Sequence, residues 1–166
     1  WITEYGIGEQ IQVIPGGAER QDSVRQGLLH LSTPWVLVHD GVRPFVTSEQ
    51  ITACCEAVRT HGAAVLAVPV KDTIKQADAQ GFVAATPDRR SLWAIQTPQA
   101  FRRTDLLAAH ERAVAEGFVG TDDAMLVERL GIPVKLVEGA YDNIKITTPE
   151  DLDYAEFVRR KRRLRD

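Results

Sequence analysis

The residues best suited to chemistry follow a short apolar run at residues 36–39, where Asp40 is succeeded by Gly41 and Arg43. Open α/β sheets bind ligands at the carboxyl ends of parallel strands, and Asp40 would lie at such an end. A carboxylate there can hold Mg²⁺, glycine lets a ligand approach the backbone, and arginine offers a fork for phosphate. The alternative is an Asp–Gly turn with a surface ion pair, and spacing alone does not decide between the two.

The surrounding sequence predicts alternating strands and helices that would position Asp40. Strands are expected over 10–15, 36–39 and 63–70, and helices between them over 22–31 and 48–60. Such alternation is typical of right-handed βαβ units around a parallel sheet. We therefore predict an α/β fold with a mainly parallel sheet.

Residues 71–93 interrupt this alternation. Two short strands, at 73–75 and 81–83, flank a polar turn and predict a hairpin. A hairpin inserted between α/β elements normally projects from the sheet, so we expect an arm that serves dimerisation or a site.

The second half of the chain returns to helices and strands. Helical periodicity is clear over 106–114, and strands are expected at 134–137 and 144–147. A last helix is predicted to begin with Thr148 as N-cap and Pro149 as its first residue, followed by acidic residues.

Composition excludes several classes of protein. Hydrophobic residues make up 44% and charged residues 26% of the chain, which excludes intrinsic disorder. No apolar run approaches the roughly 18 residues of a membrane span. Cys54 and Cys55 are adjacent and cannot readily bridge each other, and no transition-metal motif occurs. Reduced thiols without a signal-peptide pattern indicate the cytoplasm.

Charge is distributed unevenly along the chain. The formal net charge is -3, yet six of the 20 basic residues lie within residues 159–166. The remainder therefore has an acidic excess and lacks the basic surface of a nucleic-acid-binding protein. The basic tail could touch RNA, but such residues also complement the dipole at the end of a helix, which is the interpretation we favour.

Residues 38–44, with the sequence VHDGVRP, resemble the V-H-D-x-x-R-P signature of the 2-C-methyl-D-erythritol 4-phosphate cytidylyltransferase family. Further segments match the family in the right order and span nearly the whole chain. They are Gly16–Val24, Pro69–Lys75, Thr97–Gln99, Thr121–Ala124 and Val137–Leu152.

The resemblance implies a Rossmann-like nucleotidyltransferase fold in a single domain over 1–166, N-terminally truncated, with a projecting β-arm at about 71–93 that holds a homodimer. It also implies Mg²⁺-dependent transfer of CMP from CTP to 2-C-methyl-D-erythritol 4-phosphate. The products would be 4-diphosphocytidyl-2-C-methyl-D-erythritol and pyrophosphate, in non-mevalonate isoprenoid precursor biosynthesis.

By the same resemblance, CTP would lie along a set of four residues: Gly17, Ser23, Asp40 and Gly41. Asp40 would also be the metal ligand. The sugar-alcohol phosphate would contact Arg43, Thr73, Arg89, Thr97, Thr121 and Lys145. The catalytic residues would be Arg89, Lys145 and Asp40, with Thr73 and Arg89 extending from the arm into the partner's site.

The family's Gly-rich loop, with its catalytic arginine and lysine, would precede Trp1, so we expect the 166-residue chain alone to be inactive. Three alternatives remain at this point. One is a ribitol 5-phosphate cytidylyltransferase, and another is a non-catalytic dimerising remnant. The third is a receiver-type phosphoacceptor domain using Asp40 and Lys145, although the acidic pair that receivers need after their first strand is missing.

Overall fold

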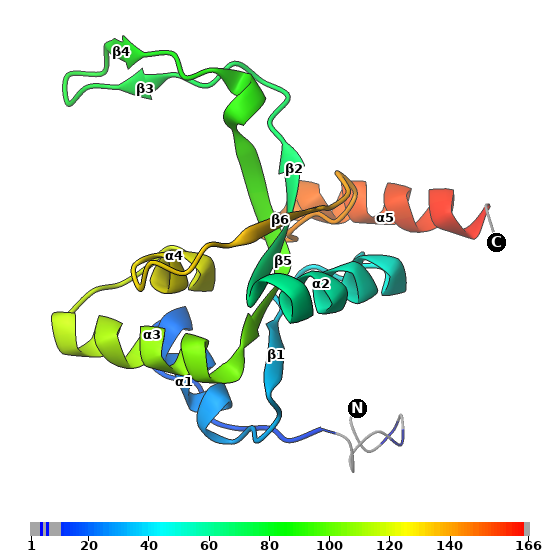
Figure 1. Ribbon diagram of the computed structural model, residues 1–166. Helices are drawn as coiled ribbons and strands as arrows, with labels where there is room; N and C mark the ends of the chain where they lie inside the picture. The colour runs from blue at the N-terminus through cyan, green and yellow to red at the C-terminus, as the bar shows by residue number, and fades with distance from the viewer. Residues whose placement is uncertain (1–3, 5, 7–10, 165–166) are drawn as a thin grey trace.

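The computed structural model describes residues 4, 6 and 11–164 and shows helices packed on both sides of a sheet (Figure 1). Within these residues the main sheet has the strand order β1-β5-β2-β6. Its strands are β1 (Trp35–Val38), β5 (Trp93–Arg102), β2 (Ala63–Pro69) and β6 (Lys135–Glu138). β2 and β6 are parallel, whereas β5 is antiparallel to both β1 and β2. The strands β1, β2 and β6 therefore share one direction, as predicted, and β5 lies against that direction between two of them.

Strand β5 was not predicted from the sequence, because its centre is polar. It contains Gln96, Thr97, Pro98 and Gln99, which interrupt any apolar run. These four side chains are nevertheless buried, and the polar ones among them form hydrogen bonds to neighbouring loops. A strand whose buried face is built from hydrogen-bonded polar groups gives no hydrophobic periodicity.

Two predicted strands are wrong. Residues 11–15 form no strand, and residue 10 lies outside the described residues. Residues 144–147 alternate apolar and polar side chains, yet they form an irregular loop. The Ile146 N–H donates to the Val42 carbonyl at 2.9 Å, so this loop is joined to the turn after β1 rather than to a strand ladder.

The sheet is covered by helices, and two of their termini show residue types that favour helix ends. The helices are α1 (Arg20–Leu29), α2 (Ser48–His61), α3 (Arg103–Glu116), α4 (Asp123–Glu128) and α5 (Pro149–Arg163). Thr148 forms a capping box with Asp151 before Pro149, which confirms the predicted start of α5. Gly62 ends α2 with a φ of 86°. In the described part of the chain, no helix combines the length and apolarity needed to cross a membrane.

The core consists of two apolar clusters on opposite faces of β2. Val65 packs with Phe101 and Leu106 in a cluster that α1, α3 and α4 complete. Leu66 packs with Val58 of α2 in the other cluster. Consecutive strand residues point to opposite faces, so β2 is buried on both sides and fixes the sheet between two helical layers (Figure 1).

The basic end of α5 contributes to packing. Arg162 stacks over Phe45 with 5.3 Å between the guanidinium carbon and the ring centroid. It donates to the Phe45 carbonyl at 2.7 Å and pairs with Asp142 at 3.1 Å. Part of the basic tail thus holds α5 against the loops that carry Phe45 and Asp142.

The predicted arm is present and projects away from the sheet (Figure 1). Its hairpin strands, β3 (Gln76–Ala77) and β4 (Val83–Ala85), lie two to three residues later than predicted, and a short 3₁₀ helix (Arg89–Ser91) follows them. Every residue from 71 to 86 is exposed. Such a segment has no core of its own to stabilise it.

The approach of the loop after β6 to β5 generates a stability prediction. A Cβ added at Gly139 would lie 2.4 Å from Gln96 Oε1, whereas one added at Gly27 in α1 would meet only Ile14, at 3.9 Å. We expect Gly139→Ala to lower the free energy of unfolding by about 1–3 kcal/mol through overpacking. The matched control Gly27→Ala should raise it by about 0.5–1 kcal/mol, because alanine favours helix interiors. Urea unfolding of both variants checks this, and equal effects would contradict the packing at Gly139.

Candidate functional site

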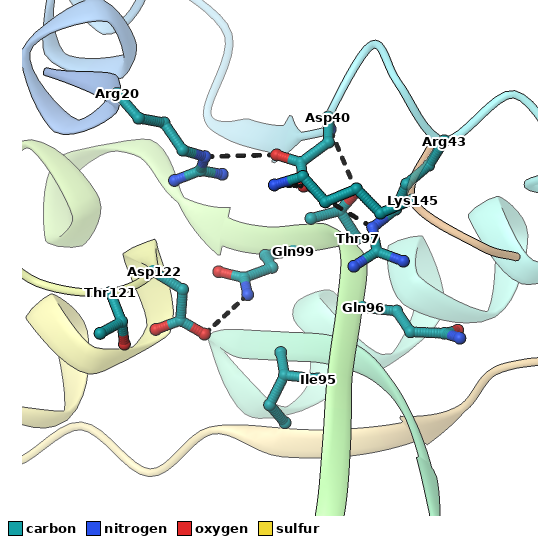
Figure 2. Close-up of a pocket in the computed structure, with 10 residues that line it drawn as sticks. All are labelled: Arg20, Asp40, Arg43, Ile95, Gln96, Thr97, Gln99, Thr121, Asp122 and Lys145. Carbon is teal, nitrogen blue, oxygen red and sulfur yellow. Dashed lines mark hydrogen bonds and ion pairs between the residues drawn. The ribbon is translucent and has the colours of Figure 1, made fainter. Parts of the chain in front are cut away.

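Two cavities lie beyond the C-terminal end of β1 and share a wall that contains Asp40. The first has a volume of about 300 Å³ and is mostly polar (Figure 2). The second, of about 410 Å³, is more open. The first is lined by Arg20, Asp40, Arg43, Ile95, Gln96, Thr97, Gln99, Thr121, Asp122 and Lys145. The second is lined by Arg20, Ser23, Val24, Val38, His39, Asp40, Gly41, Val42 and Lys145.

Asp40 is surrounded by three cationic side chains, and its own side chain is only 12% exposed. Arg20 Nε lies 3.2 Å from Asp40 Oδ1, and Lys145 Nζ lies 3.2 Å from Oδ2. Arg43 Nε lies 3.6 Å from Oδ2. Burial raises the pKa of the Asp40 carboxyl, but the Lys145 hydrogen bond and the Arg20 charge outweigh it, so the pKa is lowered overall. Asp40 is therefore a carboxylate at neutral pH.

The backbone of Asp40 is fixed by Thr97 and His39. The Asp40 N–H donates to Thr97 Oγ1 at 3.1 Å, and Thr97 Oγ1 lies 2.9 Å from His39 Nδ1. His39 Nε2 is 3.0 Å from the Arg43 carbonyl, which can only accept, so the hydrogen is assigned to Nε2. In this arrangement the Thr97 hydroxyl donates to His39 Nδ1. His39 thus orients the Thr97 hydroxyl that accepts from the Asp40 N–H.

The loop that carries Lys145 is anchored on β5 by a buried amide. Asn143 Nδ2 donates to the Thr97 carbonyl at 3.0 Å, and Gln96 Nε2 donates to the Ala140 carbonyl at 2.8 Å. Arg43 Nη1 donates to the Asn143 carbonyl at 2.9 Å. Two segments about 100 residues apart in the chain are thereby joined at the site.

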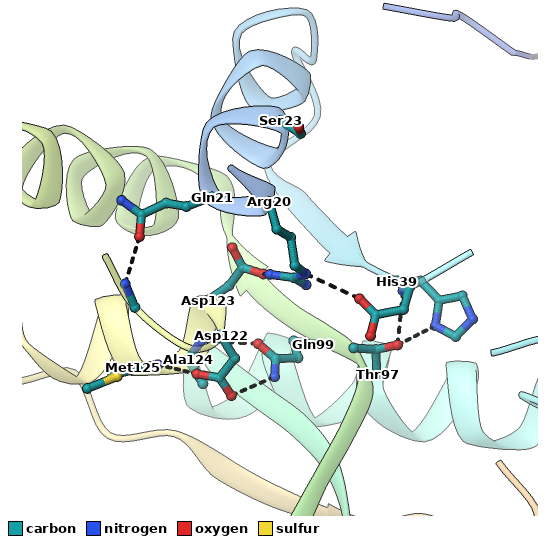
Figure 3. A network of polar contacts seen from close by, with 12 residues as sticks. Arg20, Gln21, Ser23, His39, Thr97, Gln99, Asp122, Asp123, Ala124 and Met125 are labelled. Carbon is teal, nitrogen blue, oxygen red and sulfur yellow. Dashed lines mark hydrogen bonds and ion pairs between the residues drawn. The ribbon is translucent and has the colours of Figure 1, made fainter. Parts of the chain in front are cut away.

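A second polar network lies on the α4 side of the first cavity (Figure 3). Arg20 Nη1 donates to Asp123 Oδ2 at 2.7 Å, and Gln99 Nε2 donates to Asp122 Oδ2 at 2.9 Å. Burial lowers the pKa of the Arg20 guanidinium, but Asp123 and then Asp40 raise it by more, so the net pKa is raised. Arg20 therefore keeps its positive charge.

The predicted CTP-binding residues converge only in part. Ser23 and Gly41 line the second cavity together with Asp40, and a Cβ at Gly41 would meet open space. Gly17 lines neither cavity, and its N–H donates to Ser23 Oγ at 3.0 Å. A Cβ at Gly17 would lie 2.2 Å from the Cβ of Asp22, so glycine is required there by packing at the start of α1.

The predicted acceptor-binding residues divide into two groups. Arg43, Thr97 and Thr121 line the first cavity. Lys145 lines the first cavity and also the second. The arm residues Thr73 and Arg89 line neither cavity.

Arg89 Nη1 donates instead to the Lys71 carbonyl at 2.7 Å. Within one chain, then, the structure does not bring either arm residue to Asp40. A role for them at a site would need the cavities of a second chain.

Sequence reasoning missed several residues that line the first cavity: Arg20, Gln96, Gln99 and Asp122. Three of them lie in segments that carried the family resemblance, which was the signal available. Their roles depend on contacts between distant segments, such as the bond from Arg20 to Asp123, and local patterns do not contain that information.

The metal prediction rests on Asp40 alone. Among the described residues, no group of three or more His, Cys, Asp or Glu side chains is arranged to hold a metal ion. The three protein cations around Asp40 already neutralise its charge, so they offer a second explanation for a carboxylate among phosphate-binding groups.

Known proteins resemble this chain in sequence and in structure. A family model described as IspD: 2-C-methyl-D-erythritol 4-phosphate cytidylyltransferase matches residues 2–161. The cytidylyltransferase of that name from Pelotomaculum thermopropionicum is 53% identical over 159 residues, which cover 95% of this chain and 67% of the relative. The chain thus spans about two thirds of that relative's length.

Solved structures agree with the sequence comparison. The crystal structure of 2-C-methyl-D-erythritol 4-phosphate cytidylyltransferase from Thermus thermophilus superposes with a TM-score of 0.81 at 42% identity, covering 89% of this chain and 72% of that one. The 4-diphosphocytidyl-2C-methyl-D-erythritol synthase from Anaerococcus prevotii superposes with a TM-score of 0.87 at 37% identity, covering 95% and 73%. These matches confirm the predicted fold and contradict the receiver-domain alternative.

The lowered pKa of Asp40 predicts how its contribution to stability depends on pH. The unfolded chain takes up the Asp40 proton near the ordinary value of 3.8, before the folded protein does. The stabilising contribution is therefore complete above that value and is lost as the pH falls towards the lowered pKa. We expect the free energy of unfolding of the wild type, minus that of Asp40→Asn, to decrease below about pH 4. Urea unfolding of both proteins from pH 7 to 3 measures it, and a difference that stays constant would contradict the prediction.

Proposed function

The chain belongs to the 2-C-methyl-D-erythritol 4-phosphate cytidylyltransferase family, and we propose that it transfers CMP from CTP to 2-C-methyl-D-erythritol 4-phosphate. The products are 4-diphosphocytidyl-2-C-methyl-D-erythritol, a precursor in isoprenoid synthesis, and pyrophosphate. One observation of the structure carries the proposal: Asp40, Arg20 and Lys145 line both of two adjoining cavities, and we assign the first cavity to the acceptor and the second to CTP.

The proposed reaction is a direct displacement at phosphorus. An oxygen of the acceptor phosphate attacks the α-phosphorus of CTP, a new P–O bond forms, and the bond to the β-phosphate oxygen breaks as pyrophosphate leaves. No covalent intermediate with the protein is needed, because positioning and charge neutralisation suffice. Arg43 and Lys145 line the first cavity and hold the acceptor phosphate there, where each charge-assisted contact contributes about 1.5–3 kcal/mol.

Mg²⁺ fits this site as a companion of the triphosphate. Proteins usually bind Mg²⁺ through one or two carboxylates together with substrate phosphates, and Asp40 would be the protein's ligand. When bound, the ion supplies charge neutralisation to the triphosphate. Lys145, which is 44% exposed and has a flexible side chain, can then pair with phosphate instead of with Asp40.

A homodimer held by the arm completes the proposal. Phe82 and Val83 are 72% and 62% exposed at the arm's tip, which is unusual for apolar side chains on a projecting hairpin. Contact with a second copy of the chain would cover them. Thr73 and Arg89 would then approach the partner's acceptor cavity, since neither lines either of the two cavities beside Asp40 in its own chain.

We also place the protein in the cytoplasm. Cys54 and Cys55 are both free. Burial, with a smaller effect from the neighbouring Cys55, raises the pKa of the Cys54 thiol to about 11. Free thiols are typical of a reducing compartment.

An activity measurement tests the proposed function directly. The full-length protein with CTP, Mg²⁺ and 2-C-methyl-D-erythritol 4-phosphate should release pyrophosphate and form the cytidylylated product, and ribitol 5-phosphate should be used poorly. Preference for ribitol 5-phosphate would establish the alternative acceptor, and no turnover of either would overturn the function.

Matched variants assign the two cavities in the same assay. Thr121 lines only the first cavity and Ser23 only the second. Thr121→Ala should raise KM for the acceptor about tenfold with little effect on CTP, because one hydrogen bond to a charged phosphate is lost. Ser23→Ala should do the reverse.

The arm generates a prediction about the interface. Suppose that full-length Asp40→Ala and Arg89→Ala chains, each inactive as a homodimer, are unfolded together and reassembled. In a mixed dimer one site lacks both residues and the other has both intact. Random pairing makes half of the dimers mixed, so activity should recover to about a quarter of the wild-type value.

Tagged co-purification confirms that mixed dimers form in this mixture. If Arg89 acts within its own chain, every site lacks one residue and no activity returns. Verified mixed dimers without activity would therefore remove Arg89 from the partner's site.

A further inference from the structure

A series of polar contacts leads from the buried face of α3 to the wall between the two cavities, and Figure 3 shows the part of it at Asp123 and Arg20. His110 Nε2 lies 3.1 Å from Asp123 Oδ1, and Asp123 Oδ2 accepts from Arg20 Nη1 at 2.7 Å. Arg20 Nε in turn donates to Asp40 Oδ1 at 3.2 Å. Arg20 and Asp40, at the outer end of this series, belong to the site, whereas Asp123 and His110 line neither of the two cavities.

His110 and Asp123, at the inner end of this series of contacts, are fixed by burial. The side chains of His110 and Asp123 are 0% and 1% exposed. His110 Nδ1 has no hydrogen-bond partner among the described residues, so the geometry favours the tautomer whose Nε2 hydrogen is donated to Asp123. A buried carboxylate is costly unless it is paired, and the guanidinium that pairs with Asp123 is that of Arg20.

Arg20 consequently has one strong and one exchangeable partner. Leaving Asp123 would strand a buried carboxylate, so this contact persists. Leaving Asp40 would not, because Lys145 and Arg43 also lie beside Asp40. The guanidinium of Arg20 is therefore held by Asp123 at one edge. At its edge towards the cavities it can exchange Asp40 for an incoming anion.

Arg20, at the outer end of this series of contacts, lies where the two substrates must meet. The side chain of Arg20 is 38% exposed and lines both cavities, whereas Arg43 lines only the first. In a displacement at phosphorus, negative charge accumulates between the attacking and leaving oxygens, and a planar fork of donors is well suited to stabilise it.

On the basis of the proposed function, we infer that Arg20 is a further catalytic residue that contacts the transferring phosphate. Asp123 is a positioning residue that acts through Arg20, and His110 holds Asp123 in place. The sequence distance between Arg20 and Asp123, 103 residues, explains why neither role is visible in local sequence patterns.

A double-mutant cycle in the full-length protein tests this inference. Arg20→Gln removes the guanidinium charge but keeps a polar side chain whose terminal amide nitrogen follows Cδ, as Nε does in arginine. We expect it to lower kcat by about 10²- to 10³-fold, as loss of a donor to a transition-state oxyanion does. CTP affinity, measured by calorimetry, should change much less, because Asp40, Ser23 and Gly41 remain in the nucleotide cavity.

Asp123→Asn leaves Arg20 charged but less firmly held, so kcat should fall by about 10- to 100-fold, the effect of a small misplacement. In the Arg20→Gln background, the same change should cost no more than about twofold, because there is no longer a guanidinium to position. A purely structural Asp123 would lower thermal stability without this dependence on Arg20. Equal losses of kcat in both backgrounds would overturn the positioning role.

The outcomes separate this inference from the proposed function. If the wild type turns over and Arg20→Gln has the same kcat, the inference is overturned and the proposed function stands. If the wild type does not turn over, both are overturned. Arg112→Ala is the matched control. Arg112 is a helix arginine that pairs with Glu116 at 2.7 Å, and it lines neither cavity. Its kcat should equal that of the wild type.

Discussion

The ion cluster around Asp40 is the interaction on which the site depends. Arg20, Arg43 and Lys145 come from α1, from the turn after β1 and from the loop after β6, and as cations they repel one another. One carboxylate of low exposure compensates this repulsion and fixes all three segments at once. Because the cluster is only partly open to water, the attraction is screened less than it would be at the surface.

Strand β5 supplies the framework for this cluster. Thr97 fixes the backbone of Asp40, Gln96 holds the loop of Lys145, and Gln99 holds Asp122. Each of these polar side chains is buried and hydrogen-bonded, so replacing one would leave a partner unsatisfied in the interior. The antiparallel placement of β5 between β1 and β2 brings Thr97 next to the turn after β1, Gln96 next to the loop after β6 and Gln99 next to the start of α4.

Sequence reasoning succeeded where the signal is local. Thr148 and Pro149 predicted the start of α5, and the apolar run before Asp40 predicted β1. It failed at β5 and at residues 144–147, because the first is a strand built on polar side chains and the second an alternating pattern without a partner strand. The role of Arg20 was also hidden, since it depends on folding α1 against α4.

In the proposed reaction, Asp40 and a substrate phosphate would compete for the same three cations, which would give the carboxylate a second role. Without substrate it holds the cations in place, so their geometry exists before phosphate arrives and little reorganisation is needed on binding. Lys145 can exchange Asp40 for phosphate because it is exposed, while Arg20 stays in position because Asp123 is buried. The difference in burial between these two carboxylates therefore determines which cation moves and which stays.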